Sequence, residues 1–308
     1  MPYACLSCCN LPWGPDVRAL NIPRNWPFRD ASCHIASRPH LWHVQDMGEG
    51  PTLLLIHGAG GATHSWRNLI PLLLPCYRVI ALDLPGQGFT VLGNRSRCGL
   101  EAMAQDIAAL CAHEGWQPAA IIGHSAGAAI ALRLAETLPL QAVIGINAAL
   151  SKFDGMAGWL FPAMAKLLSM TPFIPQIFSK LAGTPTQVHD LLVSTGSHIE
   201  AAGEAQYLHL VRMPSHVDAT LTMMAQWTLD ALLGRLDRQT APCLLITGAG
   251  DRAVPPAVSR KAAEVIPKAQ LANCSGFGHL MHEEAATQVA SLILPFLAQH
   301  GVAPQSRA

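Results

Sequence analysis

Residues 123–127 read Gly-His-Ser-Ala-Gly, the pattern G-x-S-x-G, and contain the residue with the clearest chemical potential, Ser125. An apolar run typical of a β-strand precedes this stretch, and an Ala-rich run typical of a helix follows at residues 126–138. A strand, a sharp turn and a helix form the context that exposes a serine as a nucleophile. The alternative is a tight turn that needs small residues and has no catalytic role. We expect Ser125 to be a nucleophile.

Two residues further along the chain could activate that serine. A serine hydroxyl is a poor nucleophile until a base takes its proton, and the base needs an acid that fixes its tautomer. His279 lies in a glycine-flanked loop after the last predicted strand, and Asp251 lies just past the preceding strand. The chain order Ser125, Asp251, His279 is that of one large class of serine hydrolases. The three residues together therefore predict a catalytic triad.

Other histidines and carboxylates compete for these roles. Asp83 also ends a predicted strand, but it precedes the nucleophile, and we expect it to bond backbone groups in a Pro-Gly turn. His282 lies one helical turn beyond His279 and is a weaker candidate for the base. His124 should point away from the nucleophile, and His57 should join loops beneath the site.

The negative charge that develops on a substrate carbonyl needs two N–H donors. The backbone N–H of Ala126, the residue after the serine, is one candidate. The second should come from the loop at residues 57–61, His-Gly-Ala-Gly-Gly, most simply from the N–H of Ala59. This loop lacks the Gly-Lys-Ser/Thr ending of a phosphate-binding loop. We expect no metal site and no cofactor.

The elements that must position these residues alternate between strands and helices. Buried strands that alternate with helices indicate βαβ crossovers and a mostly parallel, doubly wound sheet. Strands are predicted at residues 41–45, 52–56, 78–82, 142–146, 243–248 and 270–273, and helices at 65–74, 100–114, 126–138, 257–265 and 283–298. The predicted fold class is therefore α/β.

The alternation is interrupted at residues 150–239, which are mostly helical in pattern. Because this insertion follows a strand of the sheet, we expect a helical cap over the ligand-binding edge, before the strand that precedes Asp251. Between residues 155 and 183 the sequence is mostly apolar, and its only charged residues are Lys166 and Lys180. Candidate pocket residues are Trp159, Phe161, Met223, Met224 and Trp227. The cap could form a wall of a site for an apolar substrate, rest on a membrane surface, or simply pack on the core.

These patterns divide the chain into four parts. We expect a core at residues 24–149 and 240–300, the cap at 150–239, a flexible extension at 1–23 and a tail at 301–308. The extension contains Cys5, Cys8 and Cys9, but no second pair stands at zinc-like spacing, so a metal site is not favoured there.

Composition narrows the classes of function. The formal net charge of the 308 residues is zero, which argues against nucleic-acid binding. Charged residues make up 13% of the chain, compared with roughly 25% in a typical soluble domain, so part of the surface should be apolar. The odd number of cysteines, nine, favours a reducing compartment. With no secretory signal and no long apolar run, we expect a cytoplasmic protein, with membrane association through the cap left open.

The chain from about residue 20 to 299 resembles the α/β-hydrolase superfamily. Within it, the chain resembles the magnesium-chelatase accessory proteins of bacteriochlorophyll biosynthesis. The Asn-Trp-Pro at residues 25–27 and the Met-Met-Ala-Gln-Trp at 223–227 are the more discriminating motifs. The other matching stretches are residues 41–45, 57–67, 123–129 and 278–284. Gln87 departs from the superfamily, where many members carry a second histidine in that turn, a difference that we expect to bear little on catalysis.

The resemblance implies a role beside magnesium-chelatase subunits, around magnesium insertion into protoporphyrin. A serine hydrolase with a large apolar substrate, such as a porphyrin-type ester, would fit that role. The alternatives are a tetrapyrrole-binding or assembly protein with a silent triad, and a general carboxylesterase or C–C-bond hydrolase. Epoxide hydrolase and haloalkane dehalogenase chemistry is disfavoured, because those relatives carry an aspartate in place of Ser125.

Overall fold

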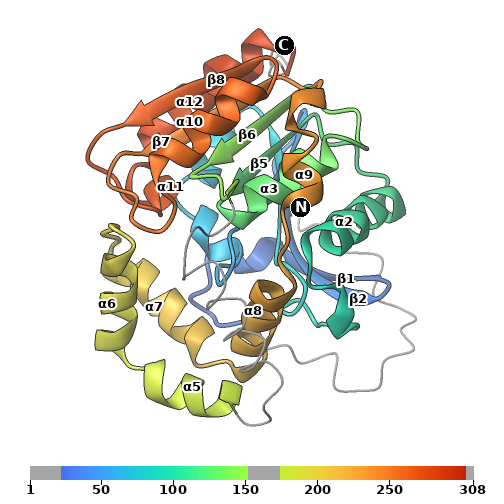
Figure 1. The fold of residues 1–308 in the computed structure, drawn as a ribbon. Helices are drawn as coiled ribbons and strands as arrows, with labels where there is room; N and C mark the ends of the chain where they lie inside the picture. The colour runs from blue at the N-terminus through green and yellow to red at the C-terminus, as the bar shows by residue number, and fades with distance from the viewer. Residues whose placement is uncertain (1–21, 152–173, 303–308) are drawn as a thin grey trace.

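The apolar runs predicted as buried strands form the centre of an eight-stranded sheet in this computed structural model, which describes residues 22–151 and 174–302 (Figure 1). The strand order is β1-β2-β4-β3-β5-β6-β7-β8. The strands are β1 (Ser32–Ser37), β2 (His40–Met47), β3 (Thr52–Ile56), β4 (Arg78–Leu82), β5 (Ala120–His124), β6 (Ala142–Ile146), β7 (Cys243–Gly248) and β8 (Ala269–Cys274). Pairing is parallel from β4 to β8 and antiparallel at β1 and β2. The predicted, mostly parallel α/β sheet is confirmed.

Helices cover both faces of this sheet (Figure 1). Those associated with the core are α1 (Ile70–Leu73), α2 (Leu100–Glu114), α3 (Ala126–Leu134), α9 (Asp230–Leu233), α10 (Pro256–Val265), α11 (Met281–Glu284) and α12 (Ala286–Gln299). Alternate residues of β3 belong to different cores: Leu54 and Ile56 pack with residues of α2 and α3, and Leu53 and Leu55 pack with residues of α1 and α12. Strands with two buried faces explain why their sequences are continuously apolar.

Three predicted helices differ from those observed, and the helix expected at residues 126–138 ends at Leu134. Residues 65–74 form a short 3-10 helix, η3 (Thr63–Trp66), and then α1. Pro71 lacks an N–H and its ring would clash with a preceding carbonyl, so one continuous helix cannot pass through it. The predicted helix at residues 283–298 is divided into α11 and α12 at Ala285, whose φ of −135° is not helical. The prediction of α2 at residues 100–114 is confirmed.

Between β6 and α9, the described residues form four α-helices that lie together beside the sheet (Figure 1). They are α5 (Ile174–Ala182), α6 (Pro185–Ser194), α7 (Ala201–Val211) and α8 (Pro214–Gln226). We call this group the helical insertion. No helix among the described residues is long and apolar enough to cross a membrane. Trp159, Phe161 and the cysteines of the N-terminal extension lie outside the described residues.

A buried polar cluster attaches the insertion to the core. Glu283 of α11 accepts a hydrogen bond from the Tyr207 hydroxyl of α7 at 2.6 Å and also pairs with Arg67. The side chain of Glu283 is fully buried. Removing either partner would leave the buried carboxylate with fewer donors, a costly arrangement, so this cluster fixes α7 against the core.

Candidate active site

Ser125 lies at the sharp turn between β5 and α3. Its φ of 52° and ψ of −116° place an L-residue in a sparsely populated region, at a cost of order 1–3 kcal/mol. Three hydrogen bonds hold this backbone: the Ser125 N–H donates to Ile146 O at 2.9 Å, and the Ser125 carbonyl accepts from Ala128 N and Ala149 N, each at 3.1 Å. These bonds to neighbouring strand and helix ends therefore hold Ser125 in its strained conformation.

The glycines of the G-x-S-x-G pattern permit close packing around this turn. A Cβ atom at Gly123 would overlap the carbonyl oxygen of Gly127, and a Cβ at Gly127 would overlap that of Ile56. The backbone of α3 consequently approaches β3 more closely than any larger residue would allow. This close approach explains the small residue types beside Ser125 without reference to catalysis.

Asp251 and His279 form a hydrogen-bonded pair at the carboxyl ends of the parallel strands. His279 Nδ1 lies 2.8 Å from Asp251 Oδ2. The other carboxylate oxygen, Oδ1, accepts from the N–H groups of Ala253 and Val254, both at 2.8 Å. Since a carboxylate accepts, His279 carries its proton on Nδ1, and Nε2 is the basic nitrogen.

His124, the residue before the serine, contacts His279 directly. The rings of His124 and His279 have centroids 4.7 Å apart, and His124 Nε2 donates to the carbonyl of His279 at 2.9 Å. Among the described hydrogen bonds, none joins Ser125 Oγ to His279 Nε2. Catalytic hydrogen bonds are often long before substrate binds and shorten afterwards. Ser125 and His279 thus lie at one edge of the sheet, with the proton-transfer contact not made.

Asn147 holds the loop that carries His279. Its Nδ2 donates to the carbonyls of Gly278 at 3.0 Å and His279 at 2.7 Å, and its Oδ1 accepts from Gly248 N at 2.8 Å. Asn147 directly follows β6, is 1% exposed and has a φ of 46°. The sequence analysis missed this residue, although a polar side chain directly after a buried strand could have identified it.

Replacing Asn147 with alanine is expected to slow ester hydrolysis by about 10- to 100-fold, because a misplacement of His279 by about 1 Å costs this much. The free energy of unfolding should also fall, since Gly248 N and the Gly278 carbonyl lose their partner and the His279 carbonyl keeps only His124. A matched control is Asn273→Ala, which removes an amide bonded to the Thr247 side chain instead. Equal rates for the two variants, measured with one ester substrate, would contradict the positioning role.

The loop after β3 packs directly on the nucleophile turn. A Cβ at Gly58 would lie 2.9 Å from the Cβ of Ser125 and 2.8 Å from His124 Nδ1. Ala59 is exposed in this loop. Among the backbone hydrogen bonds of the described residues, none uses the N–H of Ala59 or of Ala126, the first residue of α3. Within residues 22–151 and 174–302, both predicted oxyanion donors are therefore without a hydrogen-bond acceptor.

The loop residues His57 and Asp83 occupy the structural roles predicted for them. His57 Nδ1 donates to Gly58 O at 2.7 Å, and its Nε2 accepts from Leu84 N at 2.9 Å, which joins the loops after β3 and β4. Asp83 accepts from Thr63 N at 2.7 Å and Phe89 N at 2.8 Å. Its Oδ2 also lies 2.6 Å from His43 Nδ1, a contact that the sequence analysis missed.

His282, the weaker candidate for the base, is fully buried behind the site. Its ring lies between those of His124 and Trp66, with centroid distances of 4.2 and 4.8 Å. Neither ring nitrogen has a hydrogen-bond partner among the described residues. With no carboxylate partner within hydrogen-bond distance and no exposed nitrogen, His282 is poorly placed for proton transfer to a substrate.

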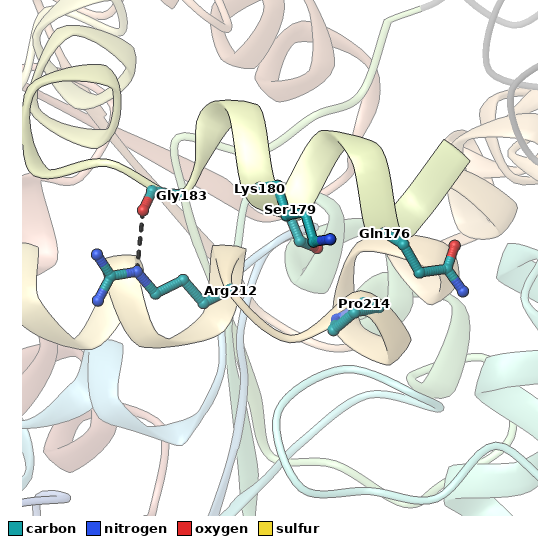
Figure 2. Close-up of a pocket in the computed structure, with 6 residues that line it drawn as sticks. All are labelled: Gln176, Ser179, Lys180, Gly183, Arg212 and Pro214. Carbon is teal, nitrogen blue, oxygen red and sulfur yellow. Dashed lines mark hydrogen bonds between the residues drawn. The ribbon is translucent and has the colours of Figure 1, made fainter. Parts of the chain in front are cut away.

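The predicted pocket residues of α8 have different surroundings. Met223 is 1% exposed and its Sδ accepts a hydrogen bond from Gln87 Nε2 at 3.1 Å. Trp227 is partly buried against the core that contains α2 and α3. A pocket of about 470 Å³ opens elsewhere, between α5 and the junction of α7 with α8 (Figure 2). Its lining residues are Gln176, Ser179, Lys180, Gly183, Arg212 and Pro214.

Burial lowers the pKa of several histidines around the site. For His216 the pKa falls to about 4, chiefly because burial disfavours the charged ring. The same cause lowers the pKa of His57, His64, His124 and His282. In the unfolded chain these rings titrate near 6.5. The folded protein therefore binds fewer protons than the unfolded chain at mildly acidic pH.

We expect the free energy of unfolding to fall as the pH drops from about 6.5 to about 4. His216 contributes about 3 kcal/mol, since one pKa unit corresponds to about 1.36 kcal/mol. Glu283 opposes the trend, because burial raises its pKa to about 7. The histidines with lowered pKa values outnumber this carboxyl, so the free energy lost on acidification should exceed the gain from Glu283. Urea titrations across this pH range test it, and an unfolding free energy that stays constant or rises on acidification would contradict it.

Comparison with known proteins places this arrangement in a family. Residues 51–286 match the family model described as the alpha/beta hydrolase fold. The chain belongs to the α/β-hydrolase family. This α/β hydrolase is 48% identical over 284 residues to the Magnesium-chelatase 30 kDa subunit of Rhodobacter capsulatus, covering 92% of this chain and 99% of that protein. The resemblance to chelatase accessory proteins is thereby confirmed.

Two further similarities are more distant. The α/β hydrolase is 28% identical over 262 residues to the Pimeloyl-[acyl-carrier protein] methyl ester esterase of Xanthomonas axonopodis pv. citri, covering 83% of this chain and 98% of that one. It superposes on the solved structure of an epoxide hydrolase with a TM-score of 0.74 at 20% identity, covering 87% and 98% of the two chains. At this identity, the structural similarity shows a shared fold alone.

Proposed function

We propose that this α/β hydrolase is a serine hydrolase that acts beside magnesium chelatase in (bacterio)chlorophyll biosynthesis. The chelatase context is supported by the high identity to the R. capsulatus subunit over nearly the full length of both chains. The observation that carries the hydrolase chemistry is the strained Ser125 turn at the sheet edge where Asp251 orients His279. A serine in a turn that costs energy to maintain is a common feature of functional sites.

In the proposed reaction, Ser125 Oγ attacks the carbonyl carbon of an ester while His279 Nε2 takes the hydroxyl proton. Asp251 stabilises the imidazolium that forms. The N–H groups of Ala59 and Ala126 donate to the oxyanion. His279 then gives its proton to the leaving alcohol, and an acyl-enzyme remains. A water molecule, deprotonated by His279, releases the acid and restores the serine.

The proposed substrate is a large apolar ester of the tetrapyrrole type. The support is the position of the insertion. It follows β6, at the edge where open α/β sheets bind ligands, and would act as a cap over the reacting bond. A relative whose name specifies a methyl ester esterase makes carboxylic esters the natural class to test first. Contact with magnesium-chelatase subunits would then deliver or receive the pigment.

A second function is favoured by the low share of charged residues, 13% of the chain, which leaves apolar surface for a pigment or a protein partner. In that case the protein would hold a tetrapyrrole or assist chelatase assembly on a hydrolase scaffold. The triad would then be silent. The name of the R. capsulatus relative, a chelatase subunit, is compatible with either role.

Complementation in a pigment-making host that lacks its own homologue separates the two. If hydrolysis is the role, Ser125→Ala should fail to restore magnesium tetrapyrroles at protein levels equal to wild type. A matched control is Ser291→Ala, which removes an exposed hydroxyl on α12. Full restoration by Ser125→Ala would establish the binding role instead.

A further inference from the structure

The insertion contacts the loop that carries Ala59 through one buried histidine. His216 of α8 is 3% exposed. Its Nε2 lies 3.2 Å from Gly60 O, and its Nδ1 lies 3.0 Å from Gly88 N. A carbonyl only accepts and an N–H only donates, so Nε2 carries the proton and Nδ1 accepts. His216 therefore joins α8 to the loops after β3 and β4 at once.

Gln87 holds the other side of the same glycine. Its Oε1 accepts from Gly60 N at 2.8 Å, and its Nε2 donates to Met223 Sδ on α8 at 3.1 Å. The N–H and the carbonyl of Gly60 are thus both engaged. Gly60 has a φ of 77°, a left-handed conformation that glycine adopts readily. A Cβ at Gly60 would lie 3.7 Å from Thr220 Cγ2, which shows how closely α8 approaches the loop.

These contacts bear on the orientation of the Ala59 amide. The Ala59 N–H belongs to the Gly58–Ala59 peptide, whose carbonyl accepts a hydrogen bond from Gly61 N at 3.0 Å. A rotation at Gly60 displaces Gly61 and therefore weakens the bond that holds this peptide. An oxyanion donor works when it is aimed in advance at the position of the developing charge. The hydrogen bonds from His216 of α8 and from Gln87 restrict that rotation at both ends of Gly60.

The surroundings keep His216 in its neutral form. Four groups face it: His57 and Asp83 from the loops after β3 and β4, His64 from η3 and His209 from α7. Burial and the neighbouring His57 lower the pKa of His216. At neutral pH the ring therefore retains one donor and one acceptor, as the contacts with Gly60 and Gly88 require.

We propose that His216 is a positioning residue for the oxyanion loop, and that the insertion must be docked through it for the Ala59 N–H to be correctly aimed. The proposal rests on the proposed hydrolase function, because it assigns the oxyanion role to Ala59. The helical insertion thereby couples its own placement to the chemical step, in addition to any contact with substrate. Gln87, which donates to Met223, holds the N–H of Gly60 in the same loop.

Two substitutions separate hydrogen bonding from packing. His216→Leu removes donor and acceptor but keeps an apolar side chain of moderate size. His216→Gln keeps an amide with one donor and one acceptor. We expect kcat for an ester to fall about 100-fold in His216→Leu with KM changed far less, because a misaimed oxyanion donor costs about this factor. His216→Gln should recover most of the loss. His189→Leu is the control, since it removes an exposed histidine of α6 that bonds Glu204 of α7 instead.

Amide hydrogen exchange gives a readout that does not depend on activity. In His216→Leu, exchange should accelerate at residues 57–63 and at 84–90, which include Gly60 and Gly88, and stay unchanged in β6. His189→Leu should leave both segments as in wild type. Unfolding by urea verifies that each variant is folded.

The outcomes distinguish the two proposals. If wild type and all variants lack ester hydrolysis, the proposed function fails, and the exchange data still decide whether His216 holds the loop. A folded His216→Leu variant with wild-type exchange at residues 57–63 would overturn the positioning role. So would wild-type kcat in that variant while Ser125→Ala is inactive.

Discussion

Ser125→Ala is expected to lose essentially all hydrolysis of a short-chain carboxylic ester, a fall in kcat of about a million-fold. The reason is that alanine offers no hydroxyl for acyl-enzyme formation, while Asp251 and His279 remain paired. Initial rates with a chromogenic ester, compared with the spontaneous background, measure the effect. Ser275→Ala, a change in the exposed loop before His279, serves as a control and should retain wild-type activity.

Residual activity of Ser125→Ala near the wild-type level would mean that another group attacks the ester. In that case the strained turn at Ser125 would have only a structural role. A wild-type protein with no activity on any ester, together with full pigment complementation by Ser125→Ala, would support the binding function.

Asp251→Asn is the second substitution with a large expected effect, a fall in kcat of about ten-thousand-fold with KM little changed. Asp251 Oδ2 lies 2.8 Å from His279 Nδ1, and Oδ1 accepts from Ala253 N and Val254 N. An asparagine satisfies those two N–H groups with its oxygen and presents its NH₂ to His279. The ring must then carry its proton on Nε2, where it cannot take one from Ser125.

The matched control is Asp237→Asn, an exposed aspartate that lies between the insertion and β7. It makes the same change of charge and should leave kcat as in wild type. A loss below about tenfold in Asp251→Asn would show that a different group orients His279. Asp83 is poorly suited to replace it, because its carboxylate is already engaged by His43 and two backbone N–H groups.

The parts of the fold that could be predicted are those with a local physical cause. The strand at residues 52–56 was predicted because a strand buried on both faces is continuously apolar, and Leu53 to Ile56 are buried in two different cores. The helix at residues 100–114 has a regular apolar face, and it ends at Gly115, which adopts the left-handed conformation with φ of 67°. Where Pro71 interrupts a periodic pattern, the prediction of one helix was wrong.

The candidate site could be predicted where a residue follows a strand of the parallel sheet. Asp251 and His279 were found in this way, and the structure brings them into a hydrogen bond. Asn147 also directly follows a strand and was overlooked, whereas His216 and the contacts of Gln87 were missed because they depend on pairs far apart in the chain. His216 and Gly60 are separated by 156 residues, and no local pattern specifies how α8 rests on the loop. Such contacts arise from tertiary packing.

Identification of the residue modified by a fluorophosphonate probe tests the central claim most directly. The probe reacts with serines whose hydroxyl is activated by a neighbouring base. We expect one phosphonate adduct per chain, located on Ser125 by mass spectrometry, and no adduct in Ser125→Ala. Asp251→Asn should be labelled far more slowly than wild type. Absence of labelling in the wild type, or equal labelling of Ser125→Ala, would contradict the assignment of Ser125 as an activated nucleophile.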